Sequence, residues 1–500
     1  MAKKKQVKTD DHEKRAGSKS KTTRVQAGGK KVTKKAAHAA LWAPSNLHNA
    51  TSDFLAETME AMSVEYASSN ICVAGEAGRL VIGIPLPSLA FEYLIQNDVY
   101  PLGRVAQIVG AEGSCKSAFA FEIVRWCRKH CGGLGALFEN ERKYSADYAM
   151  SILGHNDPRA MGLIECDDME DWQSKIQSWL ALAKKRMTGT KENPGSGRIW
   201  PAVLILDSLT GSLSRDTVAN IEKEGFAQRR FALEAMKITD FMKKMPADMQ
   251  RWPFTLLVIN HLKKKLNETG PAARPGADRH KPGGVHMAFQ ETFEFQLTRQ
   301  AGRPKKLANW TELPIGIELF KNSLGENRRD ISVNIKYWTE TNEETGEIQQ
   351  QTVFDWHEST IDLLTTLDVA GARAAIKKIV DLNVITTNEG KKVHSKALGI
   401  SEKAALPWSD AGALLMQTPK VVEPLRDLFG IKRRKPFQPG MDYLQQLEME
   451  TDRIRQEIER AETIEIPKQA AKAKKLKEVE AQDYGDEVEG EIDMEGYGEE

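Results

Sequence analysis

One short segment constrains the fold of this 500-residue chain more than any other: GRVAQIVGAEGSCKS, from Gly103 to Ser117. Its apolar run Val105–Val109 is short, rich in β-branched residues and bounded by glycines, which predicts a buried strand. A helix is predicted over Ala118–His130. The eight residues between them have the spacing of a phosphate-binding loop: Gly110, Ala111, Glu112, Gly113, Ser114, Cys115, Lys116 and Ser117.

The chemistry of such a loop depends on its backbone. The N–H groups point at an anion, and the following helix adds its positive N-terminal end. We expect Lys116 to reach the β- and γ-phosphates of ATP and the Ser117 hydroxyl to ligate Mg²⁺. Cys115 stands where the pattern usually has glycine, so its side chain restricts the backbone or crowds the phosphates. We therefore predict a site for ATP and Mg²⁺ whose affinity and turnover depend on Cys115.

The charge of the chain is segregated, although 71 Lys and Arg nearly balance 70 Asp and Glu. Residues 1–37 are crowded with lysine and arginine, and residues 478–500 are dominated by Asp and Glu. Such blocks predict disordered tails. A basic arm suits nucleic acid, and an acidic tail competes for the same basic surfaces. The alternative is that both tails only solubilise the chain.

The number and spacing of the cysteines and the lengths of the apolar stretches indicate the cellular compartment of the protein. The five cysteines are odd in number and unpaired by spacing, which is typical of a reducing environment. Cys127 and Cys131 lack a second ligand pair, so they indicate positions on a helix rather than a metal site. No apolar stretch is long enough to span a membrane, and the start lacks a signal-peptide core. We expect a cytoplasmic protein without a membrane partner.

From Gly103 onward, strand and helix patterns alternate, which predicts an α/β fold with a mostly parallel, twisted sheet flanked by helices. Helical periodicity marks Asp171–Met187 and Phe226–Lys244, and a β-hairpin is predicted from Ile331–Trp338 and Thr352–Trp356. The strands of the sheet are predicted at Val105–Val109, Gly135–Glu139, Leu163–Glu165, Ala202–Asp207, Thr255–Asn260 and Glu294–Thr298.

Composition and pattern divide the chain into six parts. One part is a charged helix with a thin apolar stripe, which fits either a helix lying on the surface or a coiled-coil partner site. The parts are a disordered basic arm (1–40), a helical oligomerisation segment (41–100), an ATPase core (101–358), a small, mainly helical C-terminal domain (359–435), the charged helix (436–477) and an acidic tail (478–500).

Polar residues end several predicted strands at the edge where a nucleotide binds. Asp207 follows the apolar run Val203–Leu206 and is the natural second acid for Mg²⁺. Glu139 and Glu141 end another strand, and either could orient the attacking water. His261 follows a third strand and could sense the γ-phosphate. Each signal is weak alone, but together they predict one site.

The segment 262–284 is long, rich in proline and glycine, and carries six lysines and arginines. A long loop without secondary structure inside a compact domain is usually functional or disordered. Because it leaves the sheet at the nucleotide edge, we predict a polyanion-binding loop whose order depends on ATP. The alternative is a flexible insertion without a role.

In combination, these motifs resemble the RecA-type homologous recombinases, and the style of divergence is most similar to phage members of that family. The resemblance covers roughly Gly78 to Trp356. The segments that carry it are GRVAQIVGAEGSCKS, ALFENERKYSADYA, VLILDS, LLVINHLKKK and the glycine pair before HMAFQETFEFQL.

The resemblance implies roles for single residues. Lys116 and Ser117 match the phosphate lysine and the Mg²⁺ hydroxyl, and Asp207 matches the acid at the metal. Three further matches are implied: Glu141 as the catalytic glutamate, with Glu139 as a weaker substitute; Tyr148 as the aromatic stacked on adenine; and His261 in place of a glutamine that links γ-phosphate to DNA. Lys321 matches a lysine that reaches the ATP of the neighbouring protomer. Arg215–Phe226 and Leu262–Gly284 correspond to two disordered DNA-binding loops.

The function that the resemblance implies is an ATP-dependent recombinase in the cytoplasm of a bacterium or an infected host cell. Such a protein is a DNA-dependent ATPase that forms homo-oligomeric filaments on single-stranded DNA and exchanges strands with homologous duplex DNA. Single-strand-binding and mediator proteins are further partners that the resemblance suggests. Two alternatives stay open: a hexameric helicase-type motor with the same core, and a DNA-binding scaffold that binds nucleotide poorly.

Overall fold

The structure is a computed structural model that describes residues 81–456 with short gaps. The gaps are 155–158, 160, 190–199, 210, 225–230, 250–251, 265–278, 281–283, 301–303, 308, 344, 368–370, 388–389, 440, 442, 444 and 455. Both predicted charged tails, residues 41–80 of the predicted N-terminal segment and the end of the charged helix therefore lie outside the described residues.

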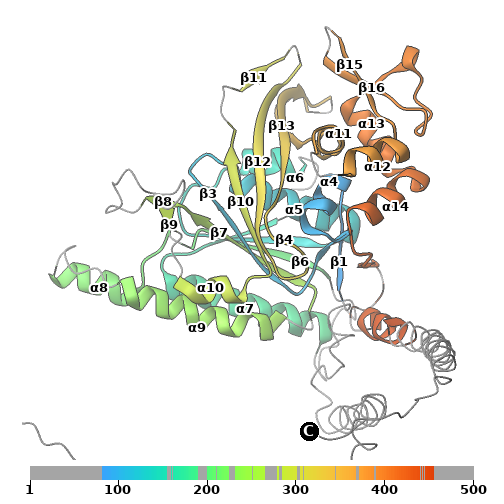
Figure 1. The fold of residues 1–500 in the computed structure, drawn as a ribbon. Coiled ribbons are helices and arrows are strands. Elements are labelled where there is room, and N and C mark those ends of the chain that lie inside the picture. Colours follow the sequence, from blue (N-terminus) through green and yellow to red (C-terminus); the bar gives the residue numbers. More distant parts are fainter. Residues whose placement is uncertain are drawn as a thin grey trace, which may run out of the picture. The chain divides into compact units, whose positions relative to one another are not determined.

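Within the described residues, the core is a sheet of ten strands (Figure 1). Its order is β14-β13-β12-β10-β3-β7-β6-β4-β5, with β11 paired to β12. The strands are β3 (Val105–Gly110), β4 (Leu134–Glu139), β5 (Met161–Glu165), β6 (Ala202–Asp207), β7 (Phe254–His261), β10 (Phe293–Arg299), β11 (Lys305–Lys306), β12 (Thr311–Asn322), β13 (Arg329–Thr341) and β14 (Ile348–Phe354).

The strands from β10 to β5 pair in parallel, and this register sets the position of their ends. Gly110 of β3 lies opposite His261 of β7, and Glu139 of β4 lies opposite Asp207 of β6. Because β3, β7, β6 and β4 are neighbours, their carboxyl ends share one edge of the sheet. The prediction of a mostly parallel α/β sheet with helices on its faces is confirmed.

Helices cover both faces of this sheet (Figure 1). The helices α4, α5 and α6 lie toward one face, and α7, α9 and α10 lie toward the other. The helices predicted after β3 and after β5 are confirmed, with ends shifted by a few residues. Their bounds are α4 (Leu89–Ile95), α5 (Lys116–Cys131), α6 (Ala146–Leu153), α7 (Met169–Thr188), α8 (Arg215–Glu224), α9 (Phe231–Met249) and α10 (Gly284–Gln290).

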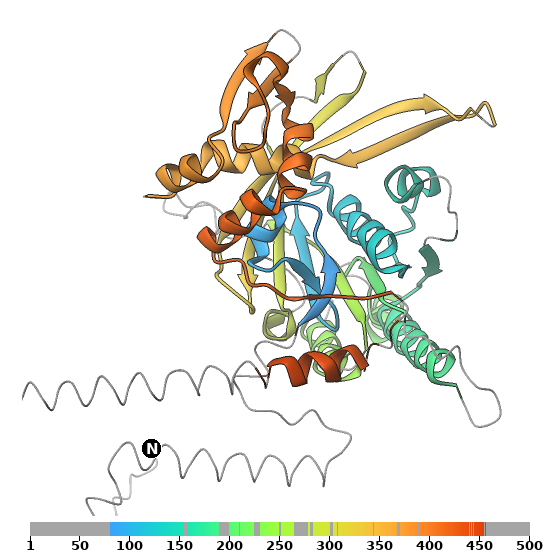
Figure 2. The same ribbon diagram turned by 90° about the vertical axis from the view of Figure 1, so that its right-hand side faces the viewer.

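The antiparallel half of the sheet carries the predicted hairpin. β13 and β14 pair from Ile335 opposite Phe354 to Thr341 opposite Ile348. The outer part of the pair extends past the end of β12, as Figure 2 shows. Gly346 has a φ of 72° in the turn between the strands, a conformation that favours glycine.

Residues 81–101 pack directly on the core. The strands β1 (Ile82–Pro85), β2 (Val99–Pro101) and β18 (Lys435–Pro436) form a small sheet in which β1 is central. In α4, the ring of Phe91 lies 5.1 Å from Trp126 and 5.9 Å from Phe119 of α5, between ring centroids. The domain boundaries near 100 and 435 stay a prediction.

The C-terminal part mixes helices with a small sheet. In this part β15, β16 and β17 form the sheet, and residues 445–454 are helical. None of the described helices is long and apolar enough to cross a membrane. The elements are α11 (Trp356–Thr366), α12 (Ala372–Ile379), β15 (Asn383–Thr387), β16 (Gly390–His394), a 3-10 turn (Glu402–Ala404), β17 (Leu406–Pro407), α13 (Trp408–Met416) and α14 (Pro419–Leu428).

Two expected loops contain regular structure. Residues 215–224 of the first are the helix α8, not a loop. Ser214 explains this difference, because its Oγ accepts a hydrogen bond from the N–H of Thr217 and caps the helix start. The second has a short antiparallel ribbon at its base, made of β8 (Lys263–Lys264) and β9 (Arg279–His280). Its centre, 265–278, lies outside the described residues.

A buried ion pair joins α4 to α14, and it generates a prediction about stability. Arg426 donates two hydrogen bonds of 2.6 and 2.5 Å to Glu92, whose side chain is 1% exposed. Arg426→Ala leaves this carboxylate buried and unpaired, so we expect the free energy of unfolding to fall by about 3–5 kcal/mol. Guanidinium denaturation of the full chain measures the loss.

The control for this substitution is Arg433→Ala. Arg433 pairs with Glu423 and Asp427 at a more exposed position. Exposed pairs contribute at most about 1 kcal/mol, so we expect a small change. Equal losses for the two variants would contradict the account.

Candidate functional site

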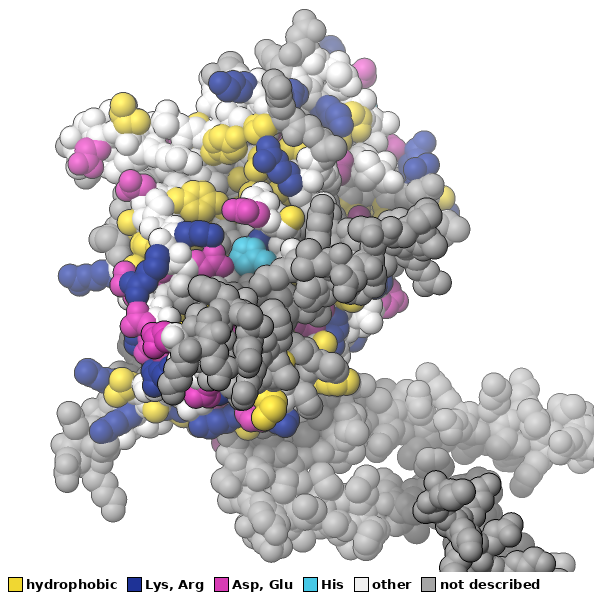
Figure 3. Space-filling view, turned by 90° about the vertical axis from the view of Figure 1, so that its left-hand side faces the viewer, with side chains coloured by type: hydrophobic (Ala, Val, Ile, Leu, Met, Phe, Trp, Pro, Cys, Tyr) yellow, Lys and Arg dark blue, Asp and Glu magenta, His cyan; other side chains and the backbone are white. Residues whose placement is uncertain are grey.

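A cavity of about 350 Å³ opens at the sheet edge where β3, β4, β6 and β7 end. Ten of the residues predicted from the sequence line it: Glu112, Gly113, Ser114, Cys115, Lys116, Ser117, Glu141, Tyr148, Asp207 and His261. Glu139, the alternative to Glu141, also lines it. Seen from the side of α8 and the β8–β9 ribbon, a histidine side chain lies among acidic and basic side chains (Figure 3).

Close packing shapes the start of the phosphate-binding loop. A Cβ atom on Gly110 would lie 2.3 Å from Ser114 Oγ and 2.6 Å from the carbonyl oxygen of Leu297, so only glycine fits there. Ser114 Oγ and Lys116 Nζ each donate a hydrogen bond of 2.8 Å to the carbonyl of Ala111. The close packing at Gly110 and the hydrogen bonds to the Ala111 carbonyl therefore stabilise the conformation of the loop, although neither residue lines the cavity.

Cys115 adopts an unusual backbone conformation. It precedes α5 with a φ of 64° and a ψ of 30°, in the left-handed region, and makes no side-chain cap hydrogen bond. This region costs a residue with a Cβ about 1–2 kcal/mol. Burial raises the pKa of its thiol above the ordinary value. Glycine is therefore the residue that this backbone favours, and the chain bears the cost of a side chain here.

The predicted metal ligands lie in contact. Ser117 Oγ donates a hydrogen bond of 2.6 Å to Asp207 Oδ2, which joins the start of α5 to the end of β6. Burial raises the pKa of Asp207 above its ordinary value, an effect that the hydrogen bond from Ser117 opposes. Hydroxyl and carboxylate oxygens are the ligands that Mg²⁺ prefers, so this pair fits that ion. The nearby Lys116 has a pKa lowered chiefly by burial.

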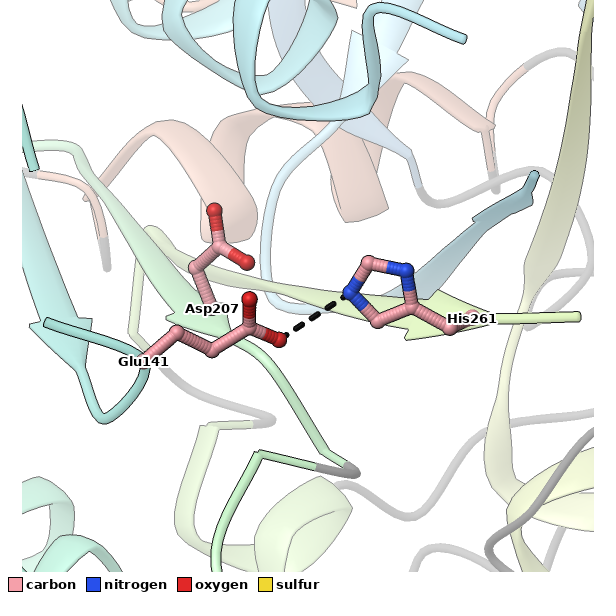
Figure 4. A group of neighbouring side chains, drawn as sticks. All are labelled: Glu141, Asp207 and His261. Atoms are coloured by element: carbon pink, nitrogen blue, oxygen red, sulfur yellow. Dashed lines mark hydrogen bonds and ion pairs between the residues drawn. The ribbon is translucent and has the colours of Figure 1, made fainter. Parts of the chain in front are cut away.

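Glu141 is held by three neighbours. His261 Nε2 lies 3.0 Å from its Oε1, Lys143 Nζ lies 3.1 Å from its Oε2, and Ser208 Oγ donates to Oε1. The hydrogen bond from His261 is the main reason that the pKa of Glu141 lies well below its ordinary value. Glu141 is therefore ionised at neutral pH. Figure 4 shows its carboxylate between Asp207 and His261.

Glu139, in contrast, accepts a hydrogen bond of 2.9 Å from the backbone N–H of Lys143. Its side chain is 5% exposed. This bond ties the carboxylate to the loop after β4. The geometry therefore favours Glu141 over Glu139 as the group that meets a nucleotide.

Sequence reasoning missed Asn140, which lies between the two glutamates. Its Nδ2 donates to the carbonyl of Ser208 at 2.8 Å, and its Oδ1 accepts from the N–H of Ser208 at 2.9 Å. The same Nδ2 lies 3.3 Å from Ser212 Oγ, which in turn accepts a hydrogen bond from the Trp172 indole. Asn140 thus fixes the residue that holds Glu141. A polar residue between two strand-ending acids is the signal that could have found it.

Tyr148 and Lys321 lie in different places. Tyr148, in the first turn of α6, lines the cavity and is 38% exposed. Lys321 does not line the cavity: its Nζ donates to the carbonyls of Ala288 and Glu291 around the end of α10. Within one chain, the structure therefore brings ten of the predicted residues and Glu139 to one cavity, whereas Gly110, Ala111 and Lys321 do not line it.

Comparisons with known proteins find RecA proteins. The chain is 22% identical to the RecA protein of Thermus thermophilus over 285 residues, which cover 57% of this chain and 75% of that protein. It is 25% identical over 236 residues to RecA of Amycolatopsis mediterranei, covering 47% of this chain and 60% of the relative. It is 24% identical over 237 residues to RecA of Lactococcus lactis, covering 47% of this chain and 54% of the relative.

No protein-family model matches the chain. The similarity nevertheless supports a distant relationship to the RecA family. The closer likeness to phage members of that family stays a prediction.

The strained backbone of Cys115 generates a prediction that compares two variants. Cys115→Ala and Cys115→Gly both remove the thiol, but only glycine relieves the left-handed strain. We expect the glycine variant to exceed the alanine variant by about 1 kcal/mol in free energy of unfolding. At an ordinary helix position alanine is the better residue, so a more stable alanine variant would contradict the assignment of strain.

Proposed function

We propose that this chain is an ATP-dependent DNA recombinase of the RecA type. It polymerises on single-stranded DNA, hydrolyses ATP in a DNA-dependent manner, and pairs and exchanges strands with homologous duplex DNA. One observation carries the proposal: a phosphate-binding loop, a Ser117–Asp207 pair and a Glu141–His261 pair line one cavity at the edge of a parallel sheet. The distant similarity to RecA proteins supports it.

Each group in the cavity has a place in phosphoryl transfer. The backbone of the loop and Lys116 hold the phosphates of ATP, and Tyr148 stacks on the adenine. The ionised carboxylate of Glu141 orients a water for attack on the γ-phosphorus and accepts a hydrogen bond from it. Ser117 and Asp207 hold Mg²⁺, which neutralises charge on the phosphates when bound. As the water oxygen bonds to the γ-phosphorus, the bond from that phosphorus to the bridging oxygen breaks. The bridging oxygen stays with ADP, and the proton of the water leaves with the phosphate product.

His261 connects this chemistry to DNA. It ends β7, and the chain continues from it through Leu262 into β8 of the basic segment 262–284. A change in what Glu141 and His261 contact is therefore transmitted along the backbone to that segment. Contacts to phosphates alone carry no sequence information, so base pairing between the two DNA molecules must supply recognition. DNA binding of this kind weakens steeply as salt increases.

The assembly that we propose is a homo-oligomeric filament with ATP between protomers. Lys321 has no place in the cavity of its own chain, which is consistent with a role at the ATP of a neighbour. Single-strand-binding and mediator proteins are proposed as partners, and we place the activity in the cytoplasm of a bacterium or an infected cell. The six-part domain division and the phage-type subgroup belong to the same proposal.

The central test replaces Lys116. Lys116→Ala removes the charge that holds the phosphates, so we expect no ATP-dependent filaments on single-stranded DNA in electron micrographs. Joint molecules with homologous duplex are lost as well. Closed rings formed by the wild type would favour the hexameric motor instead. Strand exchange that persists in Lys116→Ala would contradict the assignment of the site.

A second prediction concerns Asn140 as a positioning residue. Asn140→Ala releases Ser208 and leaves Glu141 loosely held, so we expect kcat for ATP hydrolysis to fall about 10–100-fold while KM changes little. The matched control is Asn383→Ala, because Asn383 is exposed on β15 and its amide contacts the carbonyl of Asp381. A rise in KM with unchanged kcat would instead assign Asn140 to nucleotide binding.

A further inference from the structure

Glu141, Asp207 and His261 form a compact cluster of two carboxylates and an imidazole at the cavity. Each offers one ligand atom, and these atoms all lie within 4.8 Å of one another. Asp207 and His261 end β6 and β7, Glu141 lies two residues after the end of β4, and the three side chains converge on one point (Figure 4). All three are partly exposed at the cavity, so an ion and its waters can enter from solvent.

We propose that this cluster is a binding site for a first-row transition-metal ion such as Co²⁺, Ni²⁺ or Zn²⁺. Imidazole nitrogen suits these ions, whereas Mg²⁺ selects oxygen ligands. Imidazole and carboxylate groups together, with open positions for water, ligate such ions in proteins. The Mg²⁺ ligands Ser117 and Asp207 form a different set that shares only Asp207.

The spacing of the donor atoms supports a shared ion. His261 Nε2 and Glu141 Oε1 are 3.0 Å apart. Neighbouring ligands of an octahedral ion with bonds of about 2.1 Å lie about 3.0 Å apart. The two atoms can therefore ligate one ion without moving apart. The Nε2 proton of the hydrogen bond moves to Nδ1 or leaves to solvent, and two bonds to the metal replace the hydrogen bond.

The consequence for the site is inhibition, and this part rests on the proposed function. An ion on Glu141 occupies the carboxylate that orients water, and its hold on Asp207 competes with the Ser117–Asp207 pair that takes Mg²⁺. A bound transition metal therefore inhibits ATP hydrolysis even when Mg²⁺ is in excess. A glutamine at position 261 is a weak ligand for such an ion, so the histidine creates the sensitivity.

Metal binding can be measured without nucleotide. Co²⁺ is titrated into the full chain and followed by its visible absorption, and thermal stability is recorded with Ni²⁺ and with Mg²⁺ alone. We expect saturable Co²⁺ binding and a higher melting temperature with Ni²⁺ than with Mg²⁺. His261→Gln and Glu141→Gln should each weaken Co²⁺ binding about tenfold or more.

Two controls distinguish Co²⁺ binding at this cluster from Co²⁺ binding at other histidines or at the Cys115 thiol. His394→Gln makes the same substitution on β16, outside the cavity lining, and should leave binding unchanged. The titrations are repeated in Cys115→Ala to remove the neighbouring thiol. The proposal is overturned if the wild type does not bind Co²⁺, or if His261→Gln binds it as tightly as His394→Gln does.

Inhibition of ATP hydrolysis by the bound metal is tested separately. ATP hydrolysis at saturating Mg²⁺ is measured with increasing Ni²⁺ in the wild type and in His261→Gln. We expect the concentration for half inhibition to rise about tenfold or more in the variant. Equal inhibition of both proteins would overturn the regulatory role. A chain without any ATPase activity would overturn the proposed function but leave the metal titration to be judged on its own result.

Discussion

Parallel pairing of β3, β7, β6 and β4 is the constraint on which the candidate site depends. The register places Gly110 beside His261 and Glu139 beside Asp207, so groups far apart in sequence meet at one edge. These strands are buried on both faces, so close packing of their side chains against the helices on each side fixes the register. Site geometry is therefore a consequence of core packing, not of local contacts alone.

Around this edge, hydrogen bonds orient the polar side chains of the candidate site. Ser117 and Asp207 are joined by a hydrogen bond between two oxygen atoms, and the hydrogen bond from His261 lowers the pKa of Glu141. Asn140 holds the Ser208 backbone from which a hydroxyl reaches Glu141. The same carboxylates and imidazole make the cluster that we assign to a transition metal. In our two proposals, one arrangement of side chains thus serves phosphate chemistry and creates a means of blocking it.

The sequence predicted the parallel strands of the central sheet because each is a short apolar run that ends in glycine or a polar residue. It did not predict β12. It also indicated which strand-ending residues would meet, since parallel strands deliver their ends to one edge. It did not reveal that α8 is a helix, because the capping residue Ser214 lies outside a strong periodic pattern. Nor did it reveal the position of Lys321 or the role of Asn140, which depend on backbone carbonyl and amide groups of distant segments.

The measurement that tests the account most directly is the affinity of the full chain for a fluorescent single-stranded oligonucleotide, followed by anisotropy with and without ATP and Mg²⁺. If nucleotide at the sheet edge controls the basic segment after His261, then ATP with Mg²⁺ raises the affinity and makes binding cooperative along the strand. Identical binding curves in the two conditions would contradict the account.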